Sequence, residues 1–399
     1  MEQVVCQIRR EVWILVLVFY DDIKAIMRSI KAAIKKRMKR FHRFYYVYRE
    51  VMKLKEDRKR LLDEAVKKFR EEQSEVGSLP DYRHALFRNR VSYDEYMHCY
   101  EFWNLDEKLR DEFVSEMEMR CVYRKTVQTS FNRLCCNKAM ILKSFKRYVH
   151  RKWAYTGSMS IEDFEHFVSS TDCVAKPIFG TLGRGVFVIR KDDSHNWQEL
   201  FDDCRKNNIL IEERLRACKE IEEYHPQSLN TIRVFTISKD KRCELVAAVL
   251  RMGVADCVVD NGAAGGILAS IDLNTGVVTS EGRDESGHSY LFHPDSGKSI
   301  KGFAIPYWDV VVKACKEMAN SLEEIVFAGW DICVLPDGNV EMIEVNSYPS
   351  ITVLQTAAKT GLKPRLSAIG KEVLGYDPVK LISIWSKSYV KYEGIYGRY

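Results

Sequence analysis

The sequence predicts a mixed α+β protein with a helical N-terminal region, and three observations lead to this fold class. Apolar residues follow helical spacing up to about residue 153, whereas strand-like runs dominate from Val174 onward. Near the end, the turn Pro336-Asp337-Gly338-Asn339 joins two strands into a hairpin over 330–345. Helices and strands that alternate in this way are typical of layered α+β domains. A chain of 399 residues also exceeds the usual size of a single core, so more than one domain is expected.

The chain begins with a short apolar run, Val12–Tyr20, between charged residues. A membrane-spanning helix needs about 20 apolar residues, and this run of nine is too short. Asp21 and Asp22 follow where a signal peptide would have small residues for cleavage. We therefore expect part of a buried or interface helix, with a shallow membrane contact as the alternative.

The stretch from Asp21 to Glu72 has a helical pattern and a strong excess of basic residues, with 18 Lys and Arg against nine acids. The basic residues are densest over 31–43, and aromatic residues recur at three-and-four spacing. Such a helix can lie on an anionic membrane. It can equally be a solvated face whose aromatics pack on the body of the protein. We assign 1–80 to a basic helical region.

Local signals mark the elements that follow. Gly77–Asp81 breaks the helical pattern, and Ser92-Tyr93-Asp94-Glu95 matches a capping box, so 81–124 is expected to form a separate helical segment. The predicted strands are 174–176, 186–189, 209–213, 231–238, 245–252, 266–272 and the two arms of the 330–345 hairpin. The predicted helices are 196–206, 307–322 and 364–373, with one further helix from 381 to the end.

A glycine-rich loop follows the strand that ends at Lys176, and its notable residues are Gly180, Gly183, Arg184 and Gly185. Glycines let a backbone approach phosphates closely and present N–H groups to them, and an arginine adds charge-assisted bonds. The loop is not a Walker A sequence, because no Gly-Lys-Ser/Thr and no helix follow it. Taken alone, it is better explained as a tight hairpin.

The 330–345 hairpin carries three oxygen donors, Asp331, Glu344 and Asn346, on an otherwise apolar background. Charged side chains in apolar surroundings are costly unless something pairs with them. Carboxylate and amide oxygens are ligands that Mg²⁺ accepts, usually together with phosphate oxygens. The hairpin therefore predicts a metal–nucleotide site, with exposed acids on an ordinary hairpin as the alternative.

Composition narrows the function classes. A net charge of +6 is modest and no zinc-finger, homeodomain or RNA-recognition sequence is present, so we expect no nucleic-acid partner. The 12 cysteines show no metal-ligand spacing, and we expect reduced thiols in a cytoplasmic protein. No Ser-His-Asp or Cys-His hydrolase arrangement is recognisable.

The motifs together, in this order, resemble the ATP-grasp superfamily, and in particular the sugar-transfer-associated and teichuronopeptide-type proteins. The resemblance covers roughly 130–375, with fainter similarity back to about residue 85. Its parts are Asn137-Lys138, Ala175-Lys176-Pro177, the glycine loop, 209–215, 225–234, 250–253, 261–266 and the hairpin. It implies two α+β lobes that enclose ATP, placed at 125–212 and 213–385, with a tail over 386–399.

The resemblance also implies which residues bind the nucleotide. Lysines at 138 and 176 would neutralise phosphate charge, and the 209–213 strand would bond the adenine edge. The implied nucleotide-binding residues are Lys138, Lys176, Gly180, Gly183, Arg184, Gly185, Glu212, Glu213, Leu215 and Glu220. For Lys138 an exposed helix lysine is the alternative, and for Glu220 a solvated turn.

The remaining site residues follow from the same resemblance. Arg233 and Arg251, with Lys176, would stabilise the transferring phosphoryl group; pairing of the arginines with Asp331 or Glu344 for structure alone is the alternative. The implied substrate-binding residues are His225, Asn230, Arg233, Asn261, Gly265 and Gly266. For His225, a local hydrogen bond is the stronger interpretation.

The implied activity is that of an ATP- and Mg²⁺-dependent carboxylate–amine ligase, with Mn²⁺ as an alternative cation. The implied setting is amino-acid attachment to a capsule or related cell-surface polysaccharide, so either the carboxylate donor or the amine acceptor could be sugar-linked. A kinase of the same fold acting on a sugar or alcohol, and a nucleotide-binding scaffold at the inner face of the membrane, stay open. The long N-terminal helices could also support an oligomer.

Overall fold

The computed structural model of the chain describes residues 56, 59–72, 75–180, 185–193, 196–257 and 265–382. The chain divides into two compact units, Met1–Glu64 and Ala65–Tyr399. The predicted apolar run at 12–20, the basic patch at 31–43 and the tail at 386–399 all lie outside the described residues. The domain boundaries proposed above stay a prediction.

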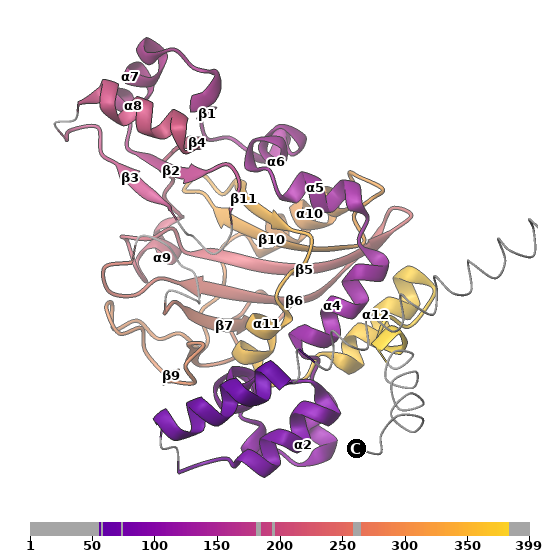
Figure 1. The fold of residues 1–399 in the computed structure, drawn as a ribbon. Helices are drawn as coiled ribbons and strands as arrows, with labels where there is room; N and C mark the ends of the chain where they lie inside the picture. Colours follow the sequence, from indigo (N-terminus) through magenta and orange to yellow (C-terminus); the bar gives the residue numbers. More distant parts are fainter. Residues whose placement is uncertain are drawn as a thin grey trace, which may run out of the picture. The chain divides into compact units, whose positions relative to one another are not determined.

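Two antiparallel sheets organise the second unit, which confirms the mixed α+β class (Figure 1). The smaller sheet has the order β1-β4-β2-β3, with β1 (Trp153–Tyr155), β2 (Cys173–Pro177), β3 (Phe187–Ile189) and β4 (Ile209–Glu213). The larger has the order β11-β10-β5-β6-β7-β8-β9, with β5 (Thr231–Lys239), β6 (Arg242–Met252), β7 (Ile267–Ile271), β8 (Gly282–Arg283), β9 (Ser289–Tyr290), β10 (Phe327–Val334) and β11 (Val340–Asn346).

The helices lie before, between and after these strands. They are α2 (Leu79–Asn89), α3 (Glu107–Arg110), α4 (Glu116–Thr126), α5 (Thr129–Cys135), α6 (Lys138–Ser144), α7 (Ile161–Ser170), α8 (Trp197–Lys206), α9 (Lys219–Glu222), α10 (Trp308–Ala319), α11 (Ile351–Ala358) and α12 (Lys363–Leu374). The predicted helices at 196–206, 307–322 and 364–373 are confirmed as α8, α10 and α12.

The predicted capping box is also present. Glu95 N donates to Ser92 Oγ at 3.2 Å, and Ser92 N donates to Glu95 Oε2 at 2.7 Å. The helix that follows winds as a π-helix over Glu95–Cys99. A capping box fixes where a helix starts, but it does not specify how the chain winds afterwards.

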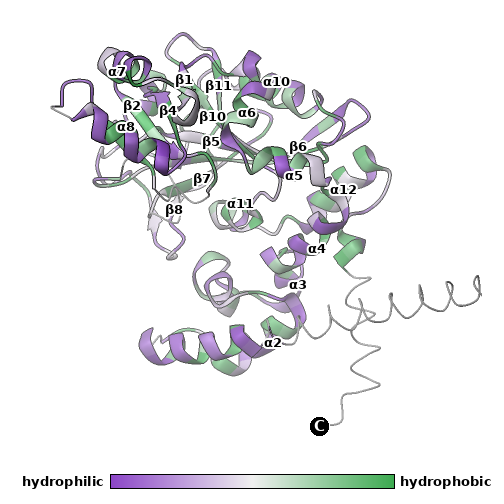
Figure 2. Ribbon diagram, turned by 45° about the horizontal axis from the view of Figure 1, so that its top comes forward, coloured by the Kyte–Doolittle hydropathy of each residue, from purple (hydrophilic) through white to green (hydrophobic). Residues whose placement is uncertain are grey.

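Helices cover both faces of the large sheet, because the strands alternate apolar residues toward each side. On one side, Val234 and Trp330 pack with Val311 of α10 in a single core cluster. On the other side, Phe235 packs with α4, α11 and α12. Figure 2 shows that helices such as α8 and α10 are hydrophilic on part of their surface and hydrophobic on the rest.

The small sheet has its own core under two helices. Phe164 of α7 and Phe201 of α8 pack on Ala175 and Ile211 from the strands. Buried thiols are common in these cores, and every cysteine among the described residues is free, as expected for reduced thiols. In the part of the chain that the structure describes, no helix combines the length and apolar character needed to cross a membrane.

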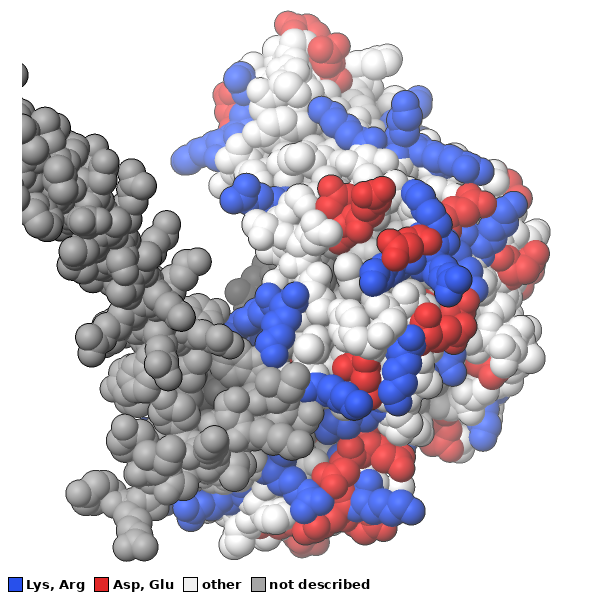
Figure 3. Space-filling model, turned by 90° about the vertical axis from the view of Figure 1, so that its right-hand side faces the viewer, with Lys and Arg blue, Asp and Glu red and all other residues white. Residues whose placement is uncertain are grey.

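Surface charge is mixed on the face of the molecule shown in Figure 3. Basic and acidic side chains of the described residues are interspersed there. This mixture agrees with the modest net charge of +6.

Candidate functional site

Charged residues from four neighbouring strands form a row across one face of the large sheet. Asp331 on β10 lies opposite Glu344 on β11 and opposite Arg233 on β5. Directly opposed residues project to the same face of a sheet. Arg251 on β6 lies opposite Thr231, two positions from Arg233, and so joins the same face.

Asp331 is at the centre of this row and is held by two arginines. Arg233 donates to it through Nε and through Nη2, the latter at 2.9 Å from Oδ2. Arg251 Nη1 lies 3.0 Å from Asp331 Oδ1. Burial alone would raise the pKa of Asp331, but the charges of the two arginines outweigh it and lower that pKa. The structure thus shows the ion pairing that was the structural alternative for both arginines.

Glu344 has no such partner. Its side chain makes no hydrogen bond or ion pair with any described residue. Burial and the neighbouring charge of Asp331 raise its pKa. Asn346 follows two residues later at the end of β11. Two carboxylates and an amide, one carboxylate being unpaired, are a donor set that fits a hard divalent cation. No group of three His, Cys, Asp or Glu side chains among the described residues is arranged to hold a metal.

Two lysines face this row from the side of the small sheet. Lys176, on β2, pairs with Glu212 of β4 at 2.8 Å. Lys138, at the start of α6, donates to the carbonyl oxygen of Gly180 at 2.7 Å. Burial lowers the pKa of Lys138, and the charge of Glu344 partly opposes that change. The proposed phosphate-binding lysines therefore approach the same region from two different elements.

A buried arginine that the sequence analysis missed joins the two sheets. Arg151, just before β1, is 2.8 Å from Glu212 Oε2 and 2.5 Å from Glu341 Oε1 on β11. It also donates to the Met342 carbonyl oxygen at 2.9 Å. Burial by itself raises the pKa of Glu212, but Arg151 and Lys176 outweigh it and lower that pKa. Arg151 thus links the Lys176–Glu212 pair to the edge of the metal hairpin.

These residues surround one cavity of about 1000 Å³. The predicted residues that line it are Lys138, Lys176, Gly180, Glu212, Glu213, Leu215, Arg233, Arg251, Asp331, Glu344 and Asn346. A second cavity, of about 1160 Å³, lies beside α10 and contains none of the predicted site residues. The second cavity is larger, but the charged groups converge on the first. We therefore take the first cavity as the candidate functional site.

Some of the predicted residues that the structure describes lie away from the cavity lining. Gly185, Gly265 and Gly266 are described but do not line it, and Gly183, Arg184 and Asn261 lie outside the described residues. Glu220 is exposed on the short helix α9, while Glu222 lines the cavity and pairs with Arg216 at 3.1 Å.

His225 and Asn230 are buried behind the cavity wall. His225 bonds to Ser228 Oγ at 2.9 Å and to the Ala255 carbonyl oxygen at 2.8 Å. Asn230 Oδ1 accepts from Gly253 N at 3.1 Å. Both side chains therefore hold the chain at 253–255, just before 261–266, which fits the local hydrogen bond expected for His225 better than direct contact with a substrate.

The sequence analysis also missed the contribution of α4. Glu116, Arg120, Tyr123 and Arg124 all line the cavity. Their spacing of four, three and one residues places them on one helical face, and this spacing was the available signal. Because 81–124 was taken as a helical segment ahead of the core, that signal was not connected to the site.

Comparisons with known proteins agree with the predicted fold. The family model for sugar-transfer associated ATP-grasp matches residues 104–371. The search of curated proteins found no match.

Several solved structures are similar at low sequence identity. The ATP-grasp ligase PsnB, complexed with minimal precursor, Mg and ADP, is 13% identical, with 63% of this chain and 61% of that chain covered and a TM-score of 0.38. The ADP complex of purK, N5-carboxyaminoimidazole ribonucleotide synthetase, is 10% identical, with coverages of 60% and 53% and a TM-score of 0.38. An L-amino acid ligase from Bacillus licheniformis is 12% identical, with coverages of 58% and 48% and a TM-score of 0.36.

In these three comparisons the match spans less than two thirds of the solved chain. The TM-scores are low, and the family model carries the assignment. That model covers more than half of the chain, including both sheets and the cavity that they line. The chain therefore belongs to the sugar-transfer associated ATP-grasp family, and its fold is the ATP-grasp fold.

Proposed function

We propose that this protein is an ATP- and Mg²⁺-dependent carboxylate–amine ligase. The observation that carries the proposal is the unpaired Glu344 carboxylate beside Asp331, in a cavity whose wall also contains Lys138, Lys176 and Arg251. An unpaired carboxylate next to converging cations is the complement of a metal-bound polyphosphate. ATP-grasp membership supports the nucleotide.

The metal would be held by Asp331, Glu344 and Asn346. Bound Mg²⁺, or Mn²⁺ as the alternative, neutralises phosphate charge and polarises the phosphorus centre that is attacked. The remaining ligands would be phosphate oxygens of ATP. Asp331 would keep its contacts with Arg233 and Arg251, since a carboxylate has about four lone-pair sites.

The nucleotide would lie along the small sheet. Lys138 and Lys176 would bind phosphates, together with the glycine loop formed by Gly180, Gly183, Arg184 and Gly185. Apolar side chains from three strands, Val174, Val188 and Ile343, line the cavity and would contact the adenine ring. The backbone of Glu212 and Glu213 would bond the adenine edge, next to Leu215.

The reaction divides into two transfers. A carboxylate oxygen of the donor substrate attacks the γ-phosphorus, and the bond to ADP breaks. The nitrogen of an amine then attacks the acyl carbon, inorganic phosphate leaves, and the amine loses a proton. Arg233 and Arg251 would stabilise the charge on the transferring phosphoryl group. The net products are an amide, ADP and phosphate.

Substrates from cell-surface polysaccharide assembly are part of this proposal. Its support is the description of the family as sugar-transfer associated and the basic sequence at 31–43, which could contact anionic lipid at the inner face of the membrane. Either the carboxylate or the amine would then belong to a glycan or its precursor.

The test is Mg²⁺-dependent ADP formation with pooled amino acids and sugar acids, with products identified by mass spectrometry. A ligase joins two substrates with loss of one water only when an amine is present. The Glu344→Gln variant should lose at least about a hundredfold in rate, because metal contacts contribute several kcal/mol to the barrier. Glu323→Gln, at an exposed position outside the cavity, is the control.

Two results would contradict the proposal. ADP formation that needs no amine and leaves phosphate on the acceptor would make the protein a kinase. Near-normal turnover in the Glu344→Gln variant would show that Glu344 is not a metal ligand.

A further inference from the structure

The cavity extends beyond the row of charged residues, past Arg251 on β6 to the next strand, β7. Arg251 lies opposite Leu268 of β7, and both line the cavity. The nucleotide side is at the other end of the row, where Arg151 and Glu212 meet β11. At about 1000 Å³ the cavity is at the upper end for a single ligand. The β7 side is therefore available to a second substrate.

Helix α4 forms part of the wall on this side. Arg120 and Arg124 are one turn apart and largely exposed, and Tyr123 between them is buried. Tyr123 packs with Phe235 and Leu268 in the core on this face of the sheet. The helix that carries the two arginines is thus anchored at the edge of the cavity.

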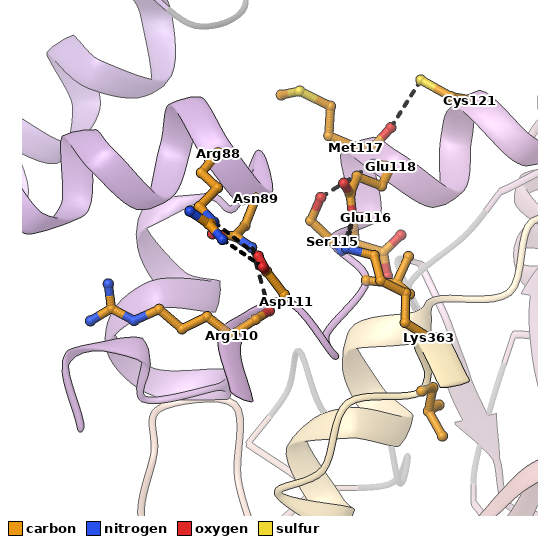
Figure 4. A network of polar contacts seen from close by, with 12 residues as sticks. Arg88, Asn89, Arg110, Asp111, Ser115, Glu116, Met117, Glu118, Cys121 and Lys363 are labelled. Carbon is orange, nitrogen blue, oxygen red and sulfur yellow. Dashed lines mark hydrogen bonds and ion pairs between the residues drawn. The ribbon is translucent and has the colours of Figure 1, made fainter. Parts of the chain in front are cut away.

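Several contacts hold α4 in place. A capping box joins Ser115 and Glu118 at its start, and Lys363 pairs with Glu118 at 3.2 Å (Figure 4). Tyr123 Oη donates to the Pro349 carbonyl oxygen at 2.8 Å, and its ring contacts that of Tyr348 at 5.4 Å. Tyr348 and Pro349 lie two and three residues after the end of β11, so α4 is attached to the metal hairpin.

Glu116, the acid one turn before Arg120, forms hydrogen bonds with residues near the start of α11 instead. Its Oε1 accepts from Ser350 Oγ and, at 3.1 Å, from Thr352 N. Arg120 makes no ion pair with any described residue. An i,i+4 acid would normally pair with such an arginine, and here the guanidinium keeps its donors available.

We propose that Arg120 and Arg124 form a second anion-binding subsite, which holds a carboxylate or phosphate group that the acceptor substrate carries away from its reacting group. Arginine suits this role because its planar fork binds either oxyanion through two parallel hydrogen bonds. The subsite rests on the proposed function, since it presumes a nucleotide at the other end of the cavity. It would select acidic acceptors over neutral ones of the same size.

The test is calorimetric titration of protein that is already saturated with Mg·AMPPNP, with Mg²⁺ in excess. Pyrophosphate and malonate are the probes, one for a phosphate source and one for a carboxylate source. We expect one further anion site in the unmodified protein, favouring the probe that matches the natural group. Its affinity should fall at least about tenfold in the Arg120→Gln/Arg124→Gln variant, while Mg·AMPPNP affinity changes little.

Two further variants make the result specific. Arg83→Gln/Arg205→Gln removes two arginines from helices outside the cavity and should leave anion binding unchanged. Arg120→Lys/Arg124→Lys keeps the charge and should retain part of the affinity. The proposed subsite would be contradicted if the unmodified protein had no second anion site. It would also be contradicted if the Arg120→Gln/Arg124→Gln variant bound the anion as tightly as the unmodified protein. Failure to bind Mg·AMPPNP at all would instead contradict the proposed function.

Discussion

Asp331 and Glu344 are neighbours across two strands, yet their surroundings differ. Asp331 is neutralised by Arg233 and Arg251, whereas Glu344 has no partner among the described residues. Removing one member of a buried ion pair leaves the other without its counter-charge, which costs more than the pair itself contributes. The two acids should therefore differ in how substitution affects stability, although both belong to the proposed metal site.

Asp331→Asn should destabilise the fold by roughly 3–5 kcal/mol, because two largely buried arginines lose their counter-charge. Glu344→Gln should leave stability unchanged or raise it, since it removes a carboxylate that repels Asp331. Urea unfolding of both variants at the same pH measures the difference. Equal free energies of unfolding for the two variants would contradict this view of the ion pairs.

The small sheet and the metal hairpin are separate elements, and Arg151 joins them. It lies between Glu212, which pairs with Lys176, and Glu341, which is fully buried on β11. His150 adds a bond from its backbone N to Glu341 Oε2 at 2.7 Å. A buried cation shared by two acids fixes orientation as well as charge, so this contact sets the position of the lysine relative to the hairpin.

Arg151→Met should destabilise the fold by roughly 3–5 kcal/mol, because two buried carboxylates lose the cation that they share, which leaves Glu212 with Lys176 and Glu341 with His150. It should also weaken Mg·AMPPNP binding, by about tenfold, since Lys176 loses the support of an oriented Glu212. Thermal unfolding and calorimetric titration measure the two effects. Arg147→Met is a matched control four residues away, because its side chain is 77% exposed. Unchanged nucleotide affinity in Arg151→Met would show that the link has no positioning role.

Across the whole second unit, Glu95 ties the first helical segment to α4 and α11. It accepts from Glu116 N at 2.8 Å and from Thr352 Oγ1 at 3.2 Å. Burial raises its pKa to about 7, against 4.5 for an ordinary glutamate, and the backbone donors oppose only part of that change. The folded protein therefore holds a proton here that the unfolded chain releases.

This proton gives stability a pH dependence with a defined sign. Between about pH 4.5 and 7 the folded state binds more protons at Glu95, so stability should fall as pH rises through this window. Each unit of the pKa difference corresponds to about 1.4 kcal/mol. Urea unfolding at several pH values should give a flatter profile for Glu95→Gln than for the unmodified protein. Parallel profiles would contradict the raised pKa.

Much of the fold could be predicted because its signals are local. The turn at 336–339 lies between two short apolar runs, and turn chemistry and alternation act within a few residues. The strands at 231–238 and 245–252 were found for the same reason and appear as β5 and β6. The short strands β8 and β9, of two residues each, were missed because so few residues carry no periodicity.

The candidate site was predictable only in part. The sequence by itself determined which strands carry Lys176, Arg233, Asp331 and Glu344, since strand position and residue type are written in contiguous segments. Only the tertiary structure decided that Arg151 meets Glu341, 190 residues away, and that the face of α4 with Arg120 and Arg124 lines the cavity. Such contacts depend on how distant segments pack to bury apolar surface and pair charges, and no local pattern encodes that choice.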